Sequence, residues 1–396
     1  MKNSKKAAIF AVCYIAYVSI YIARLNLSMA SPALTSLGII TKAQIGLLGS
    51  VFSVIYAVGR LVCGGLSDSK PPFVMIGSGL LLVSAANIGF SYLVGFSFIP
   101  PFWAMLALWS LNAFAQSMLW SSILCVITSV FGETRAKRLN SFMVTAVAVG
   151  NIAGILVDSR LILLLGVSSA FLIPGWFTLI MGVAAFIALH RIKTPVTVSV
   201  PAKKAPSFEL LRDRELLAAL IPAFLHGTMK DNISLWMAVY FTDSFGVDLE
   251  SSANFVLFIP IVGFAGRMIY PLLYRLCGER EHLVSIIGFV VCLAASIPLC
   301  FGVGSPVAAM FLLGSIYAAV SVINTSFLSI YPVRYASRGR VASVSGIMDF
   351  VTYLGAGLSS VVYGFVGYLP MFASWAVVSV VSLTVLARLI YGSKKE

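Results

Sequence analysis

The chain has 396 residues, of which 60% are hydrophobic and 10% are charged, and its formal net charge at pH 7 is +13. Its mean hydropathy of +0.99 excludes an ordinary water-soluble domain and indicates that most of the chain lies in lipid. The basic residues are scattered over short segments between apolar stretches, which favours membrane topology over nucleic-acid binding as the origin of the positive charge.

Twelve stretches are long and apolar enough to cross a bilayer, which takes about 20 residues of helix. The first follows a basic start and lacks a small-residue cleavage site, so we expect it to be a retained span rather than a signal peptide. The predicted spans are 8–30, 45–66, 73–93, 102–130, 141–158, 166–190, 217–241, 253–274, 283–302, 306–331, 342–364 and 367–390.

Charge placement gives this set of spans an orientation. With the N-terminus inside, the outer loops contain only Lys42 and Arg160, and the other loop cations lie in cytoplasmic segments. We therefore expect a multi-pass protein of the cell membrane, in bacteria the inner membrane, with both termini cytoplasmic. The polar stretch 191–216 is predicted to be a cytoplasmic linker between two six-helix bundles, 1–190 and 217–396, in an all-α membrane fold.

Weak internal similarity indicates that the two bundles are repeats. "AVGRL" (57–61) is matched 207 residues later by "FAGRM" (264–268), and Gly150 is matched 205 residues later by Gly355. Two nearly equal offsets favour homologous halves, as in many transporters, over coincidence in an apolar sequence.

Two cations interrupt apolar spans at equivalent places in these halves. Arg24 lies in the first span, and Lys230 follows it by 206 residues in the seventh. A charge near the bilayer centre costs about 2.5–3.5 kcal/mol on insertion scales, so each needs a partner or a water-filled cavity. One interpretation is neutralisation by Asp231 or Asp349, and the other is a shared anion-binding cavity.

Further polar side chains lie near these cations in the sequence. Tyr17 and Tyr21 share a helical face with Arg24, either as anion ligands or as packing aromatics. Gln116 lies one turn after Asn112, a pattern typical of either interhelical bonding or a polar pore lining. His226 precedes Lys230 by one turn and is a candidate for proton coupling or for helix packing.

Charges at the inner ends of the second and eighth spans suggest gates. Arg60 and Arg267 are equivalent in the repeat, and Asp68 follows Arg60 in "GGLSD" (64–68). A carboxylate in this position can pair with basic groups in one conformation of a gate.

Several of these stretches resemble a known family. They are "YVSIYIARLNLSMASP" (17–32), "YAVGRLVCGGLSD" (56–68), "NAFAQSMLWSSILCVITSVFGETRAKR" (112–138), "MKDNISLWMAVYFTD" (229–243) and "ASVSGIMDFVTYLGAGLSSVVYGFVGYL" (342–369). The chain resembles the major facilitator superfamily, and within it the organophosphate:inorganic phosphate antiporters, which carry glycerol phosphate or hexose phosphates. The resemblance implies that Arg24 and Lys230 bind the anion. It also implies that Tyr17, Tyr21, Tyr317 and Tyr353 match tyrosines of the binding cavity. In the leading hypothesis, Gln116 and Trp120 shape the rest of the site together with these tyrosines.

Three departures from the family pattern bear on the substrate. Lys230 stands where better known members have arginine, Leu119-Trp120-Ser121 replaces Gly-Trp-Pro, and Asp349 occupies a position often filled by glycine. A lysine keeps the charge but loses the planar fork that binds phosphate with two hydrogen bonds.

The leading hypothesis is a secondary active transporter that exchanges a phosphorylated metabolite for phosphate by alternating access. One alternative is a proton-coupled symporter of a carboxylate or other solute, in which Asp349, Asp231 or His226 titrates. A drug:proton antiporter is disfavoured because Arg24 would repel cations, and a transport-like sensor remains a further alternative. We expect a monomer in the lipid bilayer, with a small anion as partner and phosphate or a proton as the coupling ion. No phosphate loop, metal-ligand spacing or nucleophile triad points to an enzyme, a metal or another cofactor.

Overall fold

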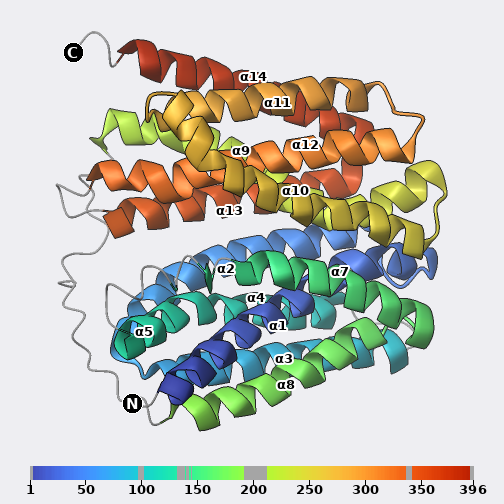
Figure 1. Cartoon of the computed structure of the whole chain (residues 1–396). Coiled ribbons are helices and arrows are strands. Elements are labelled where there is room, and N and C mark those ends of the chain that lie inside the picture. Colours follow the sequence, from blue (N-terminus) through green and yellow to red (C-terminus); the bar gives the residue numbers. More distant parts are fainter. Residues whose placement is uncertain are drawn as a thin grey trace. The chain divides into compact units, whose positions relative to one another are not determined.

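The computed structural model describes residues 3–96, 102–131, 139, 142–143, 145–190, 212–335 and 341–392. The described residues form helices and short turns, with no strand among them. The chain divides into two compact units, here called unit 1 (Met1–Lys203) and unit 2 (Lys204–Glu396) (Figure 1). Most of the predicted linker, 191–211, lies outside the described residues.

Unit 1 is drawn in blue to green in Figure 1. Its described helices are α1 (Asn3–Ser36), α2 (Lys42–Ser69), α3 (Pro72–Phe96), α4 (Phe102–Ser117), α5 (Leu119–Phe131), α7 (Thr145–Leu165) and α8 (Ser169–Leu189). Unit 2 contains α9 (Arg214–Phe245), α10 (Leu249–Leu276), α11 (Glu281–Cys300), α12 (Pro306–Thr325), α13 (Val341–Val366) and α14 (Tyr368–Gly392). A π-helical segment η2 (Ser326–Ile330) and a 3₁₀ segment η3 (Tyr331–Tyr335) follow α12.

Eleven helical spans in the described part of the chain are long and apolar enough to cross a membrane. Helices α4 and α5 together contribute one of these spans, Phe102–Ile127. The long helix outside this set is α9, whose 32 residues include Lys230, Asp231 and Asn232 in mid-helix. With α9, the described chain has the twelve long helices predicted, six in each unit, which confirms the all-α fold.

Two predicted boundaries shift for a physical reason. The span predicted at 102–130 is interrupted at Met118. The backbone amide of Met118 donates to the carbonyl oxygen of Ala115 (3.2 Å), and the hydroxyl of Ser117 donates to the carbonyl oxygen of Phe114 (2.6 Å). The span predicted to end at residue 158 continues to Leu165 in α7, so Asp158 lies inside this helix.

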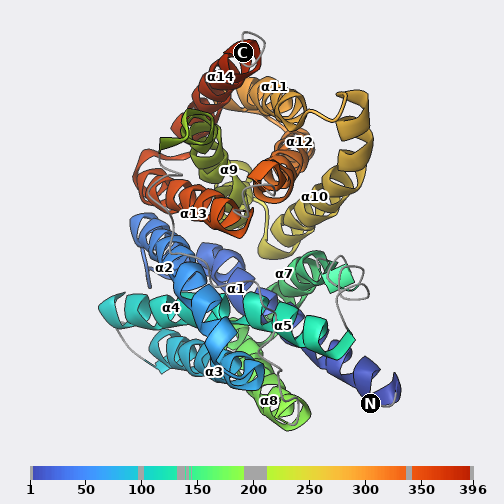
Figure 2. The ribbon, with the colours of Figure 1, turned by 90° about the vertical axis from the view of Figure 1, so that its left-hand side faces the viewer.

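The two units pair their helices in the same way. In unit 1 the closest pairs are α1 with α7, α2 with α4, and α3 with α8. In unit 2 the corresponding pairs are α9 with α13, α10 with α12, and α11 with α14. Figures 1 and 2 both show α3 beside α8 and α11 beside α14. The repeat predicted from the sequence is therefore present in the packing.

Glycines at equivalent positions allow the first of these pairs to approach closely. A Cβ atom on Gly150 of α7 would lie 2.6 Å from Cβ of Tyr21 on α1. A Cβ atom on Gly355 of α13 would lie 2.1 Å from the backbone oxygen of Phe224 on α9. Neither distance is allowed for a real side chain, so both seams require glycine.

The second pair repeats the arrangement. A Cβ atom on Gly59 of α2 would lie 2.3 Å from Oγ of Ser117 on α4, and one on Gly266 of α10 would lie 2.5 Å from the carbonyl oxygen of Ala318 on α12. These two glycines belong to the matched "AVGRL" and "FAGRM" sequences. The motif thus marks a helix contact in each unit, directly before Arg60 and Arg267.

Candidate functional site

Arg24 is anchored inside unit 1 by an amide and by aromatic rings. Its Nε donates a hydrogen bond to Oε1 of Gln116 on α4, with a distance of 2.9 Å. Its guanidinium carbon lies 4.5 Å from the ring centroid of Tyr56, 5.0 Å from that of Phe52 and 5.1 Å from that of Tyr21. Cation–π contacts at these distances stabilise a partly desolvated guanidinium without neutralising its charge.

A ladder of buried amides holds Gln116 in place. Gln116 Nε2 donates to Oδ1 of Asn112 (3.1 Å), which also accepts from Nδ2 of Asn87 (3.2 Å) on α3. Oδ1 of Asn87 in turn accepts from Nδ2 of Asn26 on α1 (2.7 Å), and Asn112 Nδ2 donates to the carbonyl of Ala23 (3.1 Å). All four amide side chains are at most 1% exposed. This amide ladder connects α1, α3 and α4 and fixes the orientation of the Arg24 guanidinium through neutral groups.

Tyr17 and Trp120 lie on the same side of unit 1. The Tyr17 ring centroid is 4.9 Å from that of Trp120 and 5.4 Å from that of Tyr21. Tyr17 is 4% exposed and belongs to a hydrophobic cluster with α3 and α5 residues, so packing explains much of its burial. Unit 1 thus brings together five of the predicted site residues: Tyr17, Tyr21, Arg24, Gln116 and Trp120.

Lys230 in unit 2 has a different environment. Its Nζ lies 3.3 Å from Oδ1 of Asp231 and 4.2 Å from the ring centroid of Tyr353 on α13. Asp349 and Tyr317 are also close enough to interact electrostatically with Lys230. The lysine side chain is 18% exposed and that of Asp231 is 36% exposed. The ion pair with Asp231 is the one considered in the sequence as an alternative to an anion site.

Two neighbours of Lys230 on α9 are fully buried. His226 lies one turn earlier. Asn232 donates from Nδ2 to Oγ of Ser359 (2.8 Å) and accepts from Oγ of Ser360 (2.7 Å), both on α13. Asn232 follows Asn26 by 206 residues, so equivalent asparagines brace both cation-bearing helices.

The predicted gate residues are only partly described. The guanidinium carbon of Arg60 lies 5.9 Å from the ring centroid of Tyr56, which also contacts Arg24. Arg267 is half-buried on α10. The side chain of Asp68 lies outside the described part, so its pairing stays a prediction.

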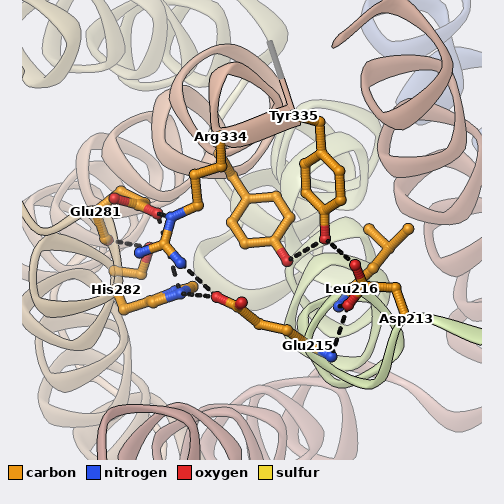
Figure 3. A network of polar contacts seen from close by, with 9 residues as sticks. Asp213, Glu215, Leu216, Glu281, His282, Arg334 and Tyr335 are labelled. Carbon is orange, nitrogen blue, oxygen red and sulfur yellow. Dashed lines mark hydrogen bonds and ion pairs between the residues drawn. The ribbon is translucent and has the colours of Figure 1, made fainter. Parts of the chain in front are cut away.

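A second polar network, which the sequence did not indicate, lies within unit 2 (Figure 3). Arg334 of η3 pairs with Glu215 at the start of α9 and with Glu281 at the start of α11. Nε2 of His282 lies 3.8 Å from Glu215 and 4.0 Å from Glu281. We call these four residues the Arg334 network.

Tyrosines extend the Arg334 network to the N-cap of α9. The hydroxyl of Tyr335 donates to Oδ2 of Asp213 (3.2 Å), and Oδ1 of Asp213 caps α9 by accepting from two backbone amides. Burial is the main cause that raises the pKa of both Tyr331 and Tyr335, so both hydroxyls remain protonated. The network thereby ties three helical segments that are far apart in sequence.

The family of the chain follows from comparison with known proteins. The model of the Major Facilitator Superfamily matches residues 13–360. The chain belongs to this superfamily. Major facilitators are transporters, and this member is a multi-pass membrane protein.

Individual relatives are more distant. The membrane sensor protein UhpC of Escherichia coli is 25% identical over 280 residues, which cover 65% of this chain and 62% of that protein. A probable hexose phosphate transport protein of Chlamydia muridarum is 27% identical over 203 residues, which cover 50% of this chain and 41% of that protein. Both matches span less than two thirds of the relative. They confirm that this major facilitator resembles the organophosphate:inorganic phosphate antiporters.

A solved structure supports the same fold. The crystal structure of a bacterial homolog of the human lysosomal transporter Spinster superposes with a TM-score of 0.76 at 14% identity. The match covers 99% of this chain and 96% of that one. At this identity the likeness concerns the fold of the major facilitator and not its substrate.

Proposed function

We propose that this major facilitator is a secondary active transporter of a small organic anion. The anion is a phosphorylated metabolite, and it is exchanged for phosphate by alternating access. The observation that carries the proposal is the fixed orientation of Arg24 by Gln116 and three aromatic rings. The resemblance to relatives named for hexose phosphate transport supports the choice of a phosphorylated substrate.

The chemistry of Arg24 suits a phosphate group. A guanidinium presents a rigid fork of N–H donors that matches the oxygens of a phosphate, and a charge-assisted bond of this kind is about twice as strong as a neutral one. Because Gln116 holds one edge of the guanidinium, its remaining rotational freedom is small. A site organised in advance in this way loses less entropy when the anion binds.

The second cation has a more adjustable role in the proposal. Lys230 attracts the anion as a point charge, and Asp231 offsets part of that charge until the anion arrives. Asp349 and His226 then remain candidates for charge pairing or coupling. Tyr17, Trp120, Tyr317 and Tyr353 shape the remainder of the site in this proposal.

Transport requires conformational change, which we assign to the two repeats. Residues 1–190 and 217–396 act as the moving halves, joined by the linker 191–216, with Arg60, Asp68 and Arg267 at the gates. Both termini are cytoplasmic in this proposal, the protein works as a monomer in the cell membrane, and phosphate or a proton is the coupling ion. Reporter fusions at each terminus test the orientation.

Exchange in reconstituted vesicles tests the function directly. The full chain is placed in phosphate-loaded liposomes, and uptake of labelled phosphate, glycerol phosphate and hexose phosphate is measured. Arg24→Ala should lower exchange at least about a hundredfold, the cost of truncating a buried charge-assisted partner. Arg388→Ala, at an exposed position of α14, is the matched control and should keep the parental rate. Parental exchange by Arg24→Ala would refute the proposal.

A second candidate function is suggested by one relative. UhpC of E. coli is named as a membrane sensor protein. A sensor built on this fold would bind the anion at Arg24 without carrying it across the membrane. Binding of a sugar phosphate, measured by thermal stabilisation, together with no uptake of any tested anion into vesicles would favour this alternative.

A further inference from the structure

Asp158 of α7 is a carboxylate without a visible role in the site described above. It is 0% exposed. Among the described residues, neither of its carboxyl oxygens has a hydrogen-bond partner. The stretch that follows, "SRLILLL", is mostly apolar and continues the helix to Leu165. The burial of a carboxyl group without these hydrogen bonds requires a physical explanation.

The position of Asp158 on α7 follows from helical spacing. Gly150, Gly154 and Asp158 are four residues apart and therefore share one face. A Cβ atom on Gly150 would contact Tyr21 of α1, and one on Gly154 would lie 3.2–3.3 Å from Leu25 and Ile22 of α1. Continuation of this register places Asp158 at the same α1–α7 seam, one turn beyond Leu25.

Within the described part of unit 1, the helices that pack most closely on α7 are α1 and α8, and few of their charged or titratable groups are near this position in sequence. On α7 itself the other charged residue is Arg160, which is exposed. On α1 the titratable groups nearest to Leu25 in sequence are Tyr21 and Arg24, and none follows Arg24 in that helix. The sequence of α8 contains no titratable residue.

Burial of an ionised carboxylate without hydrogen-bond donors is far more costly than burial of the neutral acid. Asp158 therefore holds a proton while the α1–α7 seam is closed. To ionise, its carboxyl O–H bond must break and the proton must pass to water, which requires that the seam open at this turn. Proton occupancy and the packing of α1 on α7 are thus linked.

We propose that Asp158 is a proton-binding site whose occupancy is coupled to anion transport through α1, the helix that also carries Arg24. The proposal deepens the proposed function, on which its transport consequence rests, by naming a proton site in unit 1. The protonated carboxyl favours the closed seam, and loss of the proton favours the open one. Coupling of this kind typically changes affinity by about 5–150-fold.

The first test needs no substrate. Thermal stability of the purified full chain is measured over mildly acidic to mildly alkaline pH, for the parent and for Asp158→Asn, which replaces the acid with a neutral group of the same shape. The folded parent binds one more proton than the unfolded chain, so its stability should fall with rising pH relative to that of the variant. Asp248→Asn, at the exposed N-cap of α10, is the control and should follow the parent.

The second test uses transport by the same proteins. In phosphate-loaded vesicles, a pH gradient should change parental uptake of phosphate by about tenfold, within the usual range of coupling between two sites. Asp158→Asn should lose this response and keep exchange at acidic pH. Parent and variant with the same pH dependence in both measurements would overturn the proton site. If the parent shows the expected pH dependence of stability but exchanges neither phosphate nor sugar phosphate, the proposed function alone is overturned.

Discussion

Arg24 and Lys230 occupy equivalent positions in two repeats, yet their surroundings differ in kind. Arg24 is held by neutral amides and aromatic rings, whereas Lys230 lies against a carboxylate. The difference extends through each unit. Polar contacts in the interior of unit 1 run through the amide ladder, and those of unit 2 include the Lys230–Asp231 pair and the Arg334 network. The repeat has preserved backbone packing and has allowed the electrostatics of its halves to diverge.

This divergence suggests a division of labour. The described contacts of Arg24 are with amides and aromatic rings, which orient the guanidinium, whereas Asp231 partly offsets the charge of Lys230. We therefore expect unit 1 to determine the affinity for the anionic group and unit 2 to adjust it.

The largest effect should come from exchanging the two cations. Arg24→Lys removes the guanidinium fork and the bond to Gln116, so transport efficiency should fall about tenfold to a hundredfold, the worth of one charge-assisted hydrogen bond. Lys230→Arg keeps the charge and should change efficiency only a few-fold. Concentration-dependent uptake in vesicles measures both. Equal losses in the two variants would abolish the proposed division of labour.

The Arg334 network should matter for stability more than for transport. Arg334→Gln removes the arginine that pairs with the buried carboxylate of Glu281, and we expect a loss of about 2 kcal/mol in unfolding free energy. The value lies below that of a fully buried pair because Arg334 is 41% exposed. Thermal unfolding in detergent measures it, with Arg388→Gln as the control. An unchanged melting temperature would show that the network is not structural.

Disruption of the amide ladder should cause a smaller loss of stability and should also weaken binding at the Arg24 site. Asn112→Leu removes the group that holds Gln116 and leaves the carbonyl of Ala23 without this donor, at a cost of about 1–2 kcal/mol. Because Gln116 then loses its orientation, KM for phosphate should also rise. Asn232→Leu in unit 2 should lower stability by a similar amount with less effect on KM. A larger rise in KM for Asn232→Leu than for Asn112→Leu would contradict the expectation that unit 1 determines the affinity.

The smallest expected effect is an increase in apparent affinity for phosphate. Asp231→Asn removes the charge that offsets Lys230, so KM for phosphate should fall a few-fold, consistent with the modest energy of partly exposed ion pairs, about 0–1 kcal/mol. Vesicle uptake at low phosphate measures this change. A rise in KM would mean that Asp231 helps to bind the substrate or a coupling ion.

Much of the fold could be predicted from the sequence because spans in lipid are read from local composition. The twelve helices, the family and the repeat all follow from apolar runs and short motifs. Gly59 and Gly266 were visible as a matched motif, and their contacts explain the match. Both membrane cations were also evident, because a charge within an apolar stretch stands out.

Long-range partners could not be predicted in the same way. The contacts of Arg334 span 119 residues to Glu215, and no local pattern specifies such a pairing. Asn87 and Asn26 are ordinary polar residues in apolar helices until the packing of α1 on α3 brings them together. The predicted span 141–158 ended at Asp158, and the burial of this residue inside α7, which continues to Leu165, could not be read from the local sequence.

The interruption between α4 and α5 has a mechanical consequence. Gln116, which anchors Arg24, lies two residues before the break at Met118. In unit 2 the equivalent helix α12 also loses its regular α-helical pattern, in the π segment Ser326–Ile330. Each repeat therefore contains a joint in its fourth span. Because Gln116 lies next to this break, a rotation of α5 relative to α4 at Met118 would displace the Gln116 amide and with it the Arg24 guanidinium.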